Sequence, residues 1–304
     1  MKIVITGASG QYGRSTVRKL LETTPAEDLI LMTRRPEKLS EFAALGADVR
    51  QGDFDDPASL ATAFAGGDRL LLISGTRVGA RVAQHKAAID AAAAAGVRHI
   101  AYTSILGIHP DSPAVVKRDH GPTEEMMKAS GMAWTALRDS QYMDAVVFQM
   151  IGNALRSGKW ISSAGEGRIA YVAREDCVDC AVAVLTGTGH ENRVYQITGP
   201  QLFTHRETAA LANEILGTQI DFVPTDDDGL YAMFDALGIP RHPVDDQVVA
   251  GIPWNSDDMV TFEAAIREGF FDILSSDVET LTGHPPLSLR KMLESAKDKL
   301  IEAE

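Results

Sequence analysis

Short apolar runs alternate with helical stretches through the first half of this chain, and this alternation restricts the possible folds more than any other feature. Five runs are typical of strands, at residues 2–6, 29–33, 47–53, 69–74 and 99–104. Helical patterns such as those at 14–23 and 83–96 separate them. Because parallel strands that are buried on both faces are continuously apolar, the pattern predicts an α/β fold with a doubly wound parallel sheet.

Three glycines follow the first predicted strand in the sequence ITGASGQYG: Gly7, Gly10 and Gly13. Between a strand and a helix, glycine lets the backbone approach a pyrophosphate that is held at the helix N-terminus. The spacing is G-x-x-G-x-x-G, which differs from the G-x-G-x-x-G of a typical dinucleotide loop. A plain turn would also explain three glycines, so residues further along the chain must decide.

The end of the second predicted strand carries basic residues where an NAD-binding chain carries an acid. Thr33, Arg34 and Arg35 stand there, followed by Lys38, in place of the Asp or Glu that would bind the ribose hydroxyls. Guanidinium groups suit a 2′-phosphate, because they form bidentate charge-assisted hydrogen bonds with it. We therefore predict a Rossmann-type site for NADPH in preference to NADH; the alternative is a solvated basic turn.

The next two strand ends favour the same site. Asp53 and Phe54 follow the third predicted strand and suit the edge and face of an adenine. Ser74 and Gly75 follow the fourth, and ligands of this sheet type bind at the carboxyl ends of the strands.

Two further strands are predicted at 134–139 and 194–199, and the spacing of elements becomes irregular after residue 200. A length of 304 residues fits two domains at about 150 residues each. We predict an NADP-binding core at residues 1–150 and a smaller α+β lobe on the substrate side at residues 151–304. Residues near 190–200 are expected to return to the first sheet.

Composition narrows the possible partners. A net charge of −13 disfavours nucleic acid, whose binding depends on clustered Lys and Arg. The apolar stretch Ile3–Ile5 is far shorter than that of a signal peptide, and no run approaches a membrane span, so we expect a cytoplasmic protein with a small-molecule ligand.

Cysteine and histidine patterns give little chemistry. Cys177 and Cys180 are the only cysteines, and their helical spacing favours a structural role over a redox Cys-x-x-Cys. The eight histidines are dispersed, so no metal site is predicted, and no G-x-S-x-G of a serine hydrolase occurs.

Several segments resemble the NmrA-like branch of the atypical short-chain dehydrogenase/reductases: ITGASGQYG, TRRPEK, QGDFDD, AYTS, LRDSQYMD, YVAREDC and ITGP. Within that branch the chain is similar to NADPH-dependent quinone reductases and triphenylmethane reductases, and the likeness extends to LTGHPPLSL near the C-terminus. The resemblance implies that the pyrophosphate is cradled by the loop from Gly7 to Gly13, with Ser9, Gly10, Gln11 and Tyr12.

The resemblance also implies which residues contact the rest of the cofactor. Arg34 would take the 2′-phosphate, with Arg35 and Lys38 beside it. Asp53 and Phe54 would flank the adenine, and Ser74 and Gly75 would border the ribose. The loop from Arg138 to Asp144 would lie against the nicotinamide through Arg138, Ser140, Gln141 and Tyr142.

The catalytic groups are less clear. Ordinary short-chain dehydrogenases use Tyr-x-x-x-Lys, but none of the six tyrosines here is followed by lysine at that spacing. In the corresponding region, His120, Thr123 and Glu124 resemble the His-x-x-Thr-Glu of quinone-reductase-like members. If one helix carries both, His120 and Glu124 share a face, and a histidine beside a carboxylate could act as an acid. Pro122 instead favours a helix that begins there, which would leave His120 on a loop in a surface or capping role.

Two other candidates have structural alternatives. Ser104, at the end of AYTS, could donate to a substrate oxygen or serve only in hydrogen bonds at the strand end. Tyr142 and Gln141 could face the nicotinamide or substrate, or could pack in the core.

Three functions remain open from the sequence. The first is an NADPH-dependent reductase that transfers hydride to a planar aromatic, quinone, enone or carbonyl acceptor, as a monomer or homodimer. A quinone needs little acid catalysis, which would explain the missing Tyr-x-x-x-Lys. The second is a non-catalytic NADP(H)-binding redox sensor of the NmrA type. The third, an epimerase or dehydratase, is disfavoured by the missing motif.

Overall fold

The computed structural model describes residues 1–244, 249 and 254–302, and the chain divides into two compact units. Unit 1 comprises Met1–Ile105, Asp119–Arg138 and Cys177–Tyr195. Unit 2 comprises Leu106–Arg118, Asp139–Asp176 and Gln196–Glu304. The predicted division into lobes at residue 150 stays a prediction.

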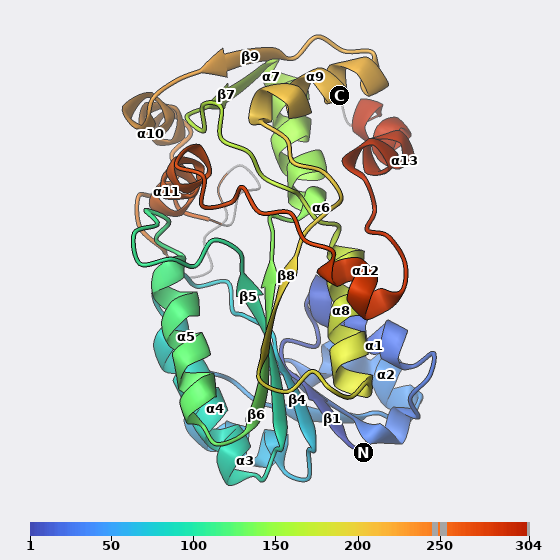
Figure 1. Cartoon of the computed structure of the whole chain (residues 1–304). Coiled ribbons are helices and arrows are strands. Elements are labelled where there is room, and N and C mark those ends of the chain that lie inside the picture. Colours follow the sequence, from blue (N-terminus) through green and yellow to red (C-terminus); the bar gives the residue numbers. More distant parts are fainter. Residues whose placement is uncertain (245–248, 250–253, 303–304) are drawn as a thin grey trace. The chain divides into compact units, whose positions relative to one another are not determined.

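A seven-stranded sheet forms the centre of unit 1 (Figure 1). Its strands, in spatial order, are β3(Asp48–Gln51), β2(Leu29–Thr33), β1(Ile3–Ile5), β4(Arg69–Leu72), β5(His99–Ile105), β6(Ala133–Asp139) and β8(Arg193–Ile197). Neighbouring strands from β3 through β5 pair in parallel. The strand order reverses between β1 and β4, which confirms the predicted doubly wound α/β fold.

Helices cover both faces of this sheet, with α3, α4 and α5 on one face and α1 and α8 on the other (Figure 1). The helices and short 3₁₀ segments are α1(Gln11–Leu20), η1(Ala26–Asp28), η2(Pro36–Leu39), α2(Ser40–Ala44), α3(Pro57–Phe64), α4(Arg81–Ala94), α5(Lys117–Ala129) and α8(Arg174–Thr186). Successive side chains of a strand point to opposite faces, so a strand between two helix layers must be apolar throughout. The strands β1, β2 and β4 meet this requirement, because nearly all their residues are fully buried.

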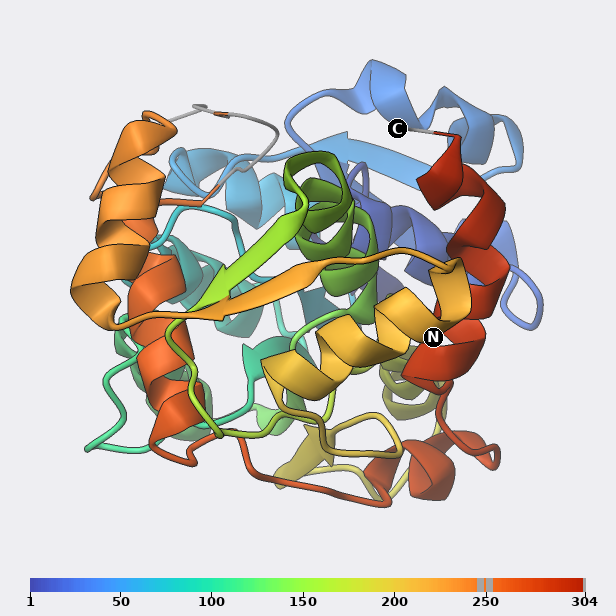
Figure 2. The same cartoon turned by 90° about the horizontal axis from the view of Figure 1, so that it is seen from above.

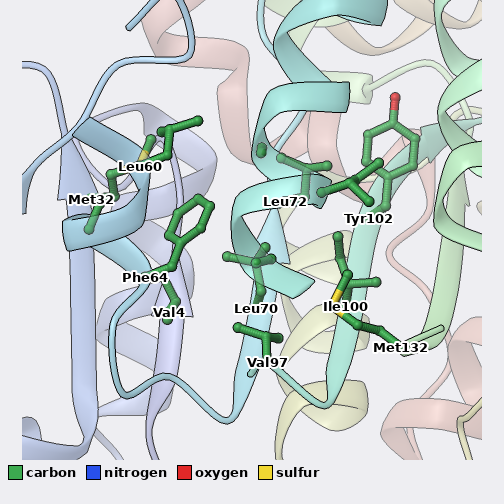
Figure 3. Packing of buried hydrophobic residues seen from close by; sticks show 14 of the residues in the cluster. Val4, Met32, Leu60, Phe64, Leu70, Leu72, Val97, Ile100, Tyr102 and Met132 are labelled. Carbon is green, nitrogen blue, oxygen red and sulfur yellow. The ribbon is translucent and has the colours of Figure 1, made fainter. Parts of the chain in front are cut away.

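The main hydrophobic core of unit 1 lies on the face that α3, α4 and α5 cover. Figure 3 shows Phe64 of α3 beside Val4 of β1, with Leu70 of β4 and Ile100 of β5 further along the same face. All four side chains are fully buried. Burial of one such side chain stabilises the fold by about 1.5–3 kcal/mol, so this layer contributes much of the stability of unit 1.

Unit 2 contains a two-stranded parallel sheet, β7(Lys159–Ser162) and β9(Asp221–Pro224), which Figure 2 shows edge to edge. Its helices are α6(Met143–Ala145), the π-helix η3(Val146–Ile151), α7(Gly152–Ser157), α9(His205–Leu216), α10(Asp227–Ala236), α11(Ser256–Arg267), α12(Asp277–Thr282) and α13(Leu289–Ile301). Within the described ranges, no helix has both the length and the apolar character needed to cross a membrane. The same residues contain no group of three acidic, histidine or cysteine side chains that could hold a metal ion.

A buried carboxylate ties α11 to the end of β7. One oxygen of Glu263 accepts hydrogen bonds from the backbone N–H of Ser163 at 2.6 Å and of Ala164 at 3.1 Å, and from the hydroxyl of Ser162 at 2.9 Å. His205 completes the group, with Nδ1 2.8 Å from the Ser162 hydroxyl. A buried charge is tolerated only with such partners, so Glu263 holds this part of unit 2 together.

The substitution Glu263→Gln should lower the free energy of unfolding by about 2–3 kcal/mol, because an amide replaces the charged acceptor of three donors. Urea denaturation measures the change. Glu268→Gln, at an exposed position after the same helix, should change stability by less than about 0.5 kcal/mol. Equal effects of the two substitutions would contradict the structural role of Glu263.

Candidate functional site

The glycine loop between β1 and α1 has a backbone conformation and a close packing that other residue types would not allow. Gly7 has a φ of +57°, a left-handed conformation that favours glycine. The N–H of Gly10 donates to the carbonyl of Gly7 at 2.9 Å and closes the turn. A Cβ at Gly13 would lie 2.5 Å from the Gly7 carbonyl oxygen, so only glycine lets α1 pack this closely on the loop.

Helix α1 begins at Gln11, three residues before the predicted start at residue 14, because Gly10 is already its N-cap. The cap has no side-chain hydrogen bond. The first N–H groups of a helix lack partners within it and carry the positive end of the helix dipole. The loop therefore ends in backbone donors, from Gln11 to Gly13, that suit a phosphate.

Two side chains of this loop form hydrogen bonds that hold the loop in place. The hydroxyl of Ser9 lies 2.9 Å from that of Thr33, which connects the loop to the end of β2. The phenol of Tyr12 donates to the carbonyl of Cys177 in α8 at 2.9 Å. A cofactor contact of Tyr12 would thus come from its backbone. Both Cys177 and Cys180 are buried, which agrees with the structural role favoured by their spacing.

The end of β2 presents positive charge to solvent. Arg34 and Arg35 directly follow the strand, Lys38 lies in η2, and all three are exposed. None of them forms an ion pair with another residue of the described chain, whereas nearby Arg14 pairs with Glu41. These cations are available to an anion, as the predicted 2′-phosphate site requires.

The next strand ends supply further polar groups at the same edge of the sheet. The carboxylate of Asp53 accepts the N–H of Asp55 at 3.1 Å. Phe54 is partly buried against the core and lies edge-on to the ring of His85. The N–H of Ser74 donates to the hydroxyl of Thr103 at 2.9 Å. Because β1 to β4 are parallel, their following residues share one edge, where ligands of this fold class bind.

His120 lies inside α5, which begins at Lys117, so the expectation that the helix starts at Pro122 and leaves His120 on a loop is wrong. Pro122 removes only one backbone hydrogen bond of the helix. Side chains hold the turn before it instead. The hydroxyl of Thr123 donates to the carbonyl of Asp119 at 2.7 Å, and the carboxylate of Asp119 accepts the N–H of Gly79 at 2.8 Å.

The surroundings of His120 contradict its predicted proton near neutral pH. Its Nδ1 lies 2.7 Å from the phenol oxygen of Tyr102, and its Nε2 lies 3.4 Å from the guanidinium of Arg81. Burial, with the charges of Arg81 and His85, holds the pKa of His120 well below its usual value. At neutral pH the imidazole is uncharged, and any catalytic role of His120 stays a prediction for that neutral form.

The expected carboxylate partner of His120 is used elsewhere. Glu124 forms a bidentate ion pair with Arg138, at 2.9 and 2.7 Å, and accepts the hydroxyl proton of Ser104 at 2.7 Å. This bond supports the interpretation of Ser104 as a donor at the end of its strand, because Ser104 of β5 has its acceptor in Glu124 of α5. Arg138 lies in β6 rather than in a loop, and its guanidinium is held by this carboxylate.

Sequence reasoning missed the residues around His120. Arg81 and Tyr102 are buried, and the guanidinium of Arg81 lies 3.7 Å from the carboxylate of Asp119. Four buried residues form this group, the Arg81 cluster: Arg81, Asp119, His120 and Tyr102. The one available signal was the pair Asp119–His120 beside the Thr-Glu motif, because Arg81 looks like an ordinary solvated residue at the start of a helix.

The remaining predicted residues lie in unit 2, between β6 and η3. The phenol of Tyr142 donates to the carboxylate of Asp139 at 2.8 Å, and the guanidinium of Arg174 lies over its ring. Ser140 is buried, with its N–H bonded to the carbonyl of Ile197, and the side-chain amide of Gln141 contacts the sulfur of Met150. The π-helix that follows is a form found frequently at functional sites.

Together, the doubly wound sheet, the glycine loop and the basic end of β2 define a dinucleotide-binding protein. A family model described as NAD(P)H-binding matches residues 7–187. The chain belongs to this NAD(P)H-binding family.

Two relatives are similar over nearly the whole chain. Quinone oxidoreductase 2 of Escherichia coli is 35% identical over 288 residues, which cover 94% of this chain and 96% of that protein. The crystal structure of that enzyme with NADPH has a TM-score of 0.87 and covers 96% of this chain and 99% of its own. A triphenylmethane reductase of Citrobacter sp. is 30% identical, with a TM-score of 0.85 and coverage of 98% and 100%.

An NmrA-like family domain-containing oxidoreductase of Aspergillus flavus is 29% identical over 227 residues, 73% of each chain. These similarities confirm the predicted resemblance to NmrA-like reductases. The individual cofactor and catalytic residues stay predictions.

The buried histidines should make stability depend on pH. Burial lowers the pKa of His85 to about 3, and burial also lowers the pKa of His120. As the pH drops below about 6.5, these histidines bind protons in the unfolded chain but not in the folded chain. The free energy of unfolding therefore falls with pH, by about 1.4 kcal/mol per pH unit for each such histidine. Urea denaturation from about pH 7.5 to about pH 5.5 measures this slope. The slope should be smaller in His120→Gln, and parallel curves for the two proteins would contradict a neutral buried His120.

Proposed function

We propose that this chain is an NADPH-dependent reductase that transfers hydride to a quinone or a similarly electrophilic planar acceptor. The choice of NADPH rests on Arg34 and Arg35, which are exposed and unpaired at the end of β2, where NAD-binding chains have an acid. The similarity to quinone oxidoreductase 2 over 94% of the chain supports the acceptor.

The described residues fit the dinucleotide. The glycine loop offers a backbone without side chains that leads to the N-terminus of α1, where the pyrophosphate would lie over Gly7, Gly10 and Gly13. The proposed binding residues also include Ser9, Gln11, Tyr12, Arg34, Arg35, Lys38, Asp53, Phe54, Ser74, Gly75, Arg138, Ser140, Gln141 and Tyr142. Of these, Tyr12 would contribute through its backbone and Arg138 through its ion pair with Glu124.

Bound NADPH supplies hydride. The task of the protein is then to orient cofactor and acceptor and to exclude water. Reduction of a quinone produces a stabilised phenolate that solvent can protonate, so the site needs no strong acid. This agrees with the neutral state of His120 and with the hydroxyl of Ser104, which is committed to Glu124.

A carbonyl acceptor would require a proton donor at the reacting oxygen. Tyr142 is the remaining candidate, and its phenol donates to Asp139. A quinonoid acceptor is therefore the better match. The cytoplasmic location and the oligomeric state, monomer or homodimer, stay predictions.

The reaction is tested by following the loss of NADPH absorbance with a panel of quinones, enones, aromatic ketones and triarylmethane dyes. We expect turnover with quinones, faster with NADPH than with NADH, and little with simple ketones. Calorimetry of NADPH binding is the companion measurement. Tight binding without turnover of any acceptor would contradict the reductase and favour the NADP(H) sensor.

The cofactor preference is tested with the double variant Arg34→Ala/Arg35→Ala. Loss of charge-assisted hydrogen bonds to the 2′-phosphate should raise the KM for NADPH about 10- to 100-fold and leave the KM for NADH nearly unchanged. Arg98→Ala is the matched control, because Arg98 is an exposed arginine just before β5, at the amino ends of the strands and away from the candidate site. An equal rise in both KM values would show that these arginines do not read the 2′-phosphate.

A further inference from the structure

The segment Ser74–Ala80 joins β4 to α4 without forming a helix or strand, yet side chains from several elements hold its backbone. Thr103 of β5 accepts the N–H of Ser74 at 2.9 Å. The guanidinium of Arg81 donates to the carbonyl of Gly75 at 2.6 Å. Asp119 of α5 accepts the N–H of Gly79 at 2.8 Å. The segment is thus held near its start, at Ser74 and Gly75, and near its end, at Gly79.

Arg81 is unusual for the place it occupies. It is the first residue of α4, and a cation there opposes the positive end of the helix dipole. It is also 7% exposed, so its charge has been removed from water. Burial of an arginine is costly unless ion pairs and hydrogen bonds offset it. A helix that needed only stability would begin with an acid or a capping residue, so this placement indicates another requirement.

The partners of Arg81 connect the segment to α5 and β5. Its guanidinium lies 3.7 Å from the carboxylate of Asp119 and 3.4 Å from Nε2 of His120. Arginine can only donate, so Nε2 accepts and the proton of the neutral imidazole lies on Nδ1. That Nδ1–H donates to the phenol oxygen of Tyr102, 2.7 Å away.

Burial raises the pKa of Tyr102, and the charge of Arg81 with the hydroxyls of Thr123 and Ser74 opposes that rise. The Arg81 cluster contacts the segment itself at two residues: Arg81 donates to the carbonyl of Gly75, and Asp119 accepts the N–H of Gly79.

We propose that Arg81 and Asp119 form a positioning pair that holds the segment Ser74–Gly79 in its cofactor-binding conformation before NADPH arrives. This inference rests on the proposed function, in which Ser74 and Gly75 border the ribose. A segment that is ordered in advance loses less conformational entropy on binding, so the pair raises affinity without touching the reacting atoms. Neither residue is a catalytic residue in this account.

The test is Arg81→Met, with NADPH affinity measured by calorimetry and kcat and KM measured with a quinone. If the released segment populates the binding conformation about one-tenth of the time, the Kd for NADPH rises about tenfold. At saturating NADPH, kcat should stay within about twofold, because the pair acts only on binding. Asp119→Asn should shift the Kd in the same direction, and Arg81→Lys should retain part of the affinity.

A matched control is Arg69→Met. Arg69 begins β4 at the opposite end of the strand and likewise donates to backbone carbonyls, those of Val184, Leu185 and Gly187. Its loss should lower stability and leave the Kd for NADPH unchanged. An increase in Kd as large as that of Arg81→Met would overturn the proposal, because any loss of stability would then weaken binding.

The double variant Arg81→Met with Asp119→Leu separates positioning from stability, and it serves where the single variant fails to fold. It removes both buried charges together, so it should be more stable than Arg81→Met alone. We expect its Kd to stay about tenfold above the wild type. A Kd that returns to the wild-type value along with stability would show that the pair is structural only. Failure of the wild-type chain to bind NADPH would be a different result, which contradicts the proposed function itself.

Discussion

Burial of the parallel sheet on both faces is the constraint on which the rest of unit 1 depends. Strand β1 and residues 70–72 of β4 have no room for polar side chains, since helices cover them on either side. Polar groups are therefore displaced to the turns that follow the strands, and parallel pairing gathers those turns at one edge. The candidate cofactor site is a consequence of this arrangement: Gly7, Arg34 and Ser74 follow the apolar strands β1, β2 and β4, and Asp53 follows β3, the outer strand beside β2.

The same constraint explains what the sequence predicted well. The strands at 29–33 and 69–74 are continuous apolar runs, and the structure has β2 at Leu29–Thr33 and β4 at Arg69–Leu72. The glycine loop and the arginines after β2 could be recognised because their chemistry is local: a positive φ, a close helix, and charge without a neighbouring acid. These features depend on residues within a few positions of one another.

Prediction failed where distant residues decide the outcome. Pro122 favours a helix start when judged from its neighbours, but contacts of Asp119 with Gly79 and of His120 with Tyr102 hold the preceding turn in α5. The spacing of His120 and Glu124 suggested a proton-sharing pair, and Arg138 and Ser104 take the carboxylate instead. Arg81 was missed because nothing near it in the sequence shows that it is buried. Each error concerns a polar group whose partner is at least 14 residues away, as in the pair of Glu124 with Arg138.

Two buried ionic groups in unit 1 also clarify what kind of chemistry this protein supports. The pair of Glu124 and Arg138 satisfies the hydroxyl of Ser104, and Arg81, which pairs with Asp119, adds its charge to the burial that keeps His120 neutral. Polar side chains that would act as acids in a carbonyl reductase are thus committed to holding strand ends and the segment after β4. An acceptor that receives hydride and leaves as a stabilised anion does not need those acids. In the proposed reductase, the buried charges would order the backbone after β4, and catalysis would depend mainly on orientation.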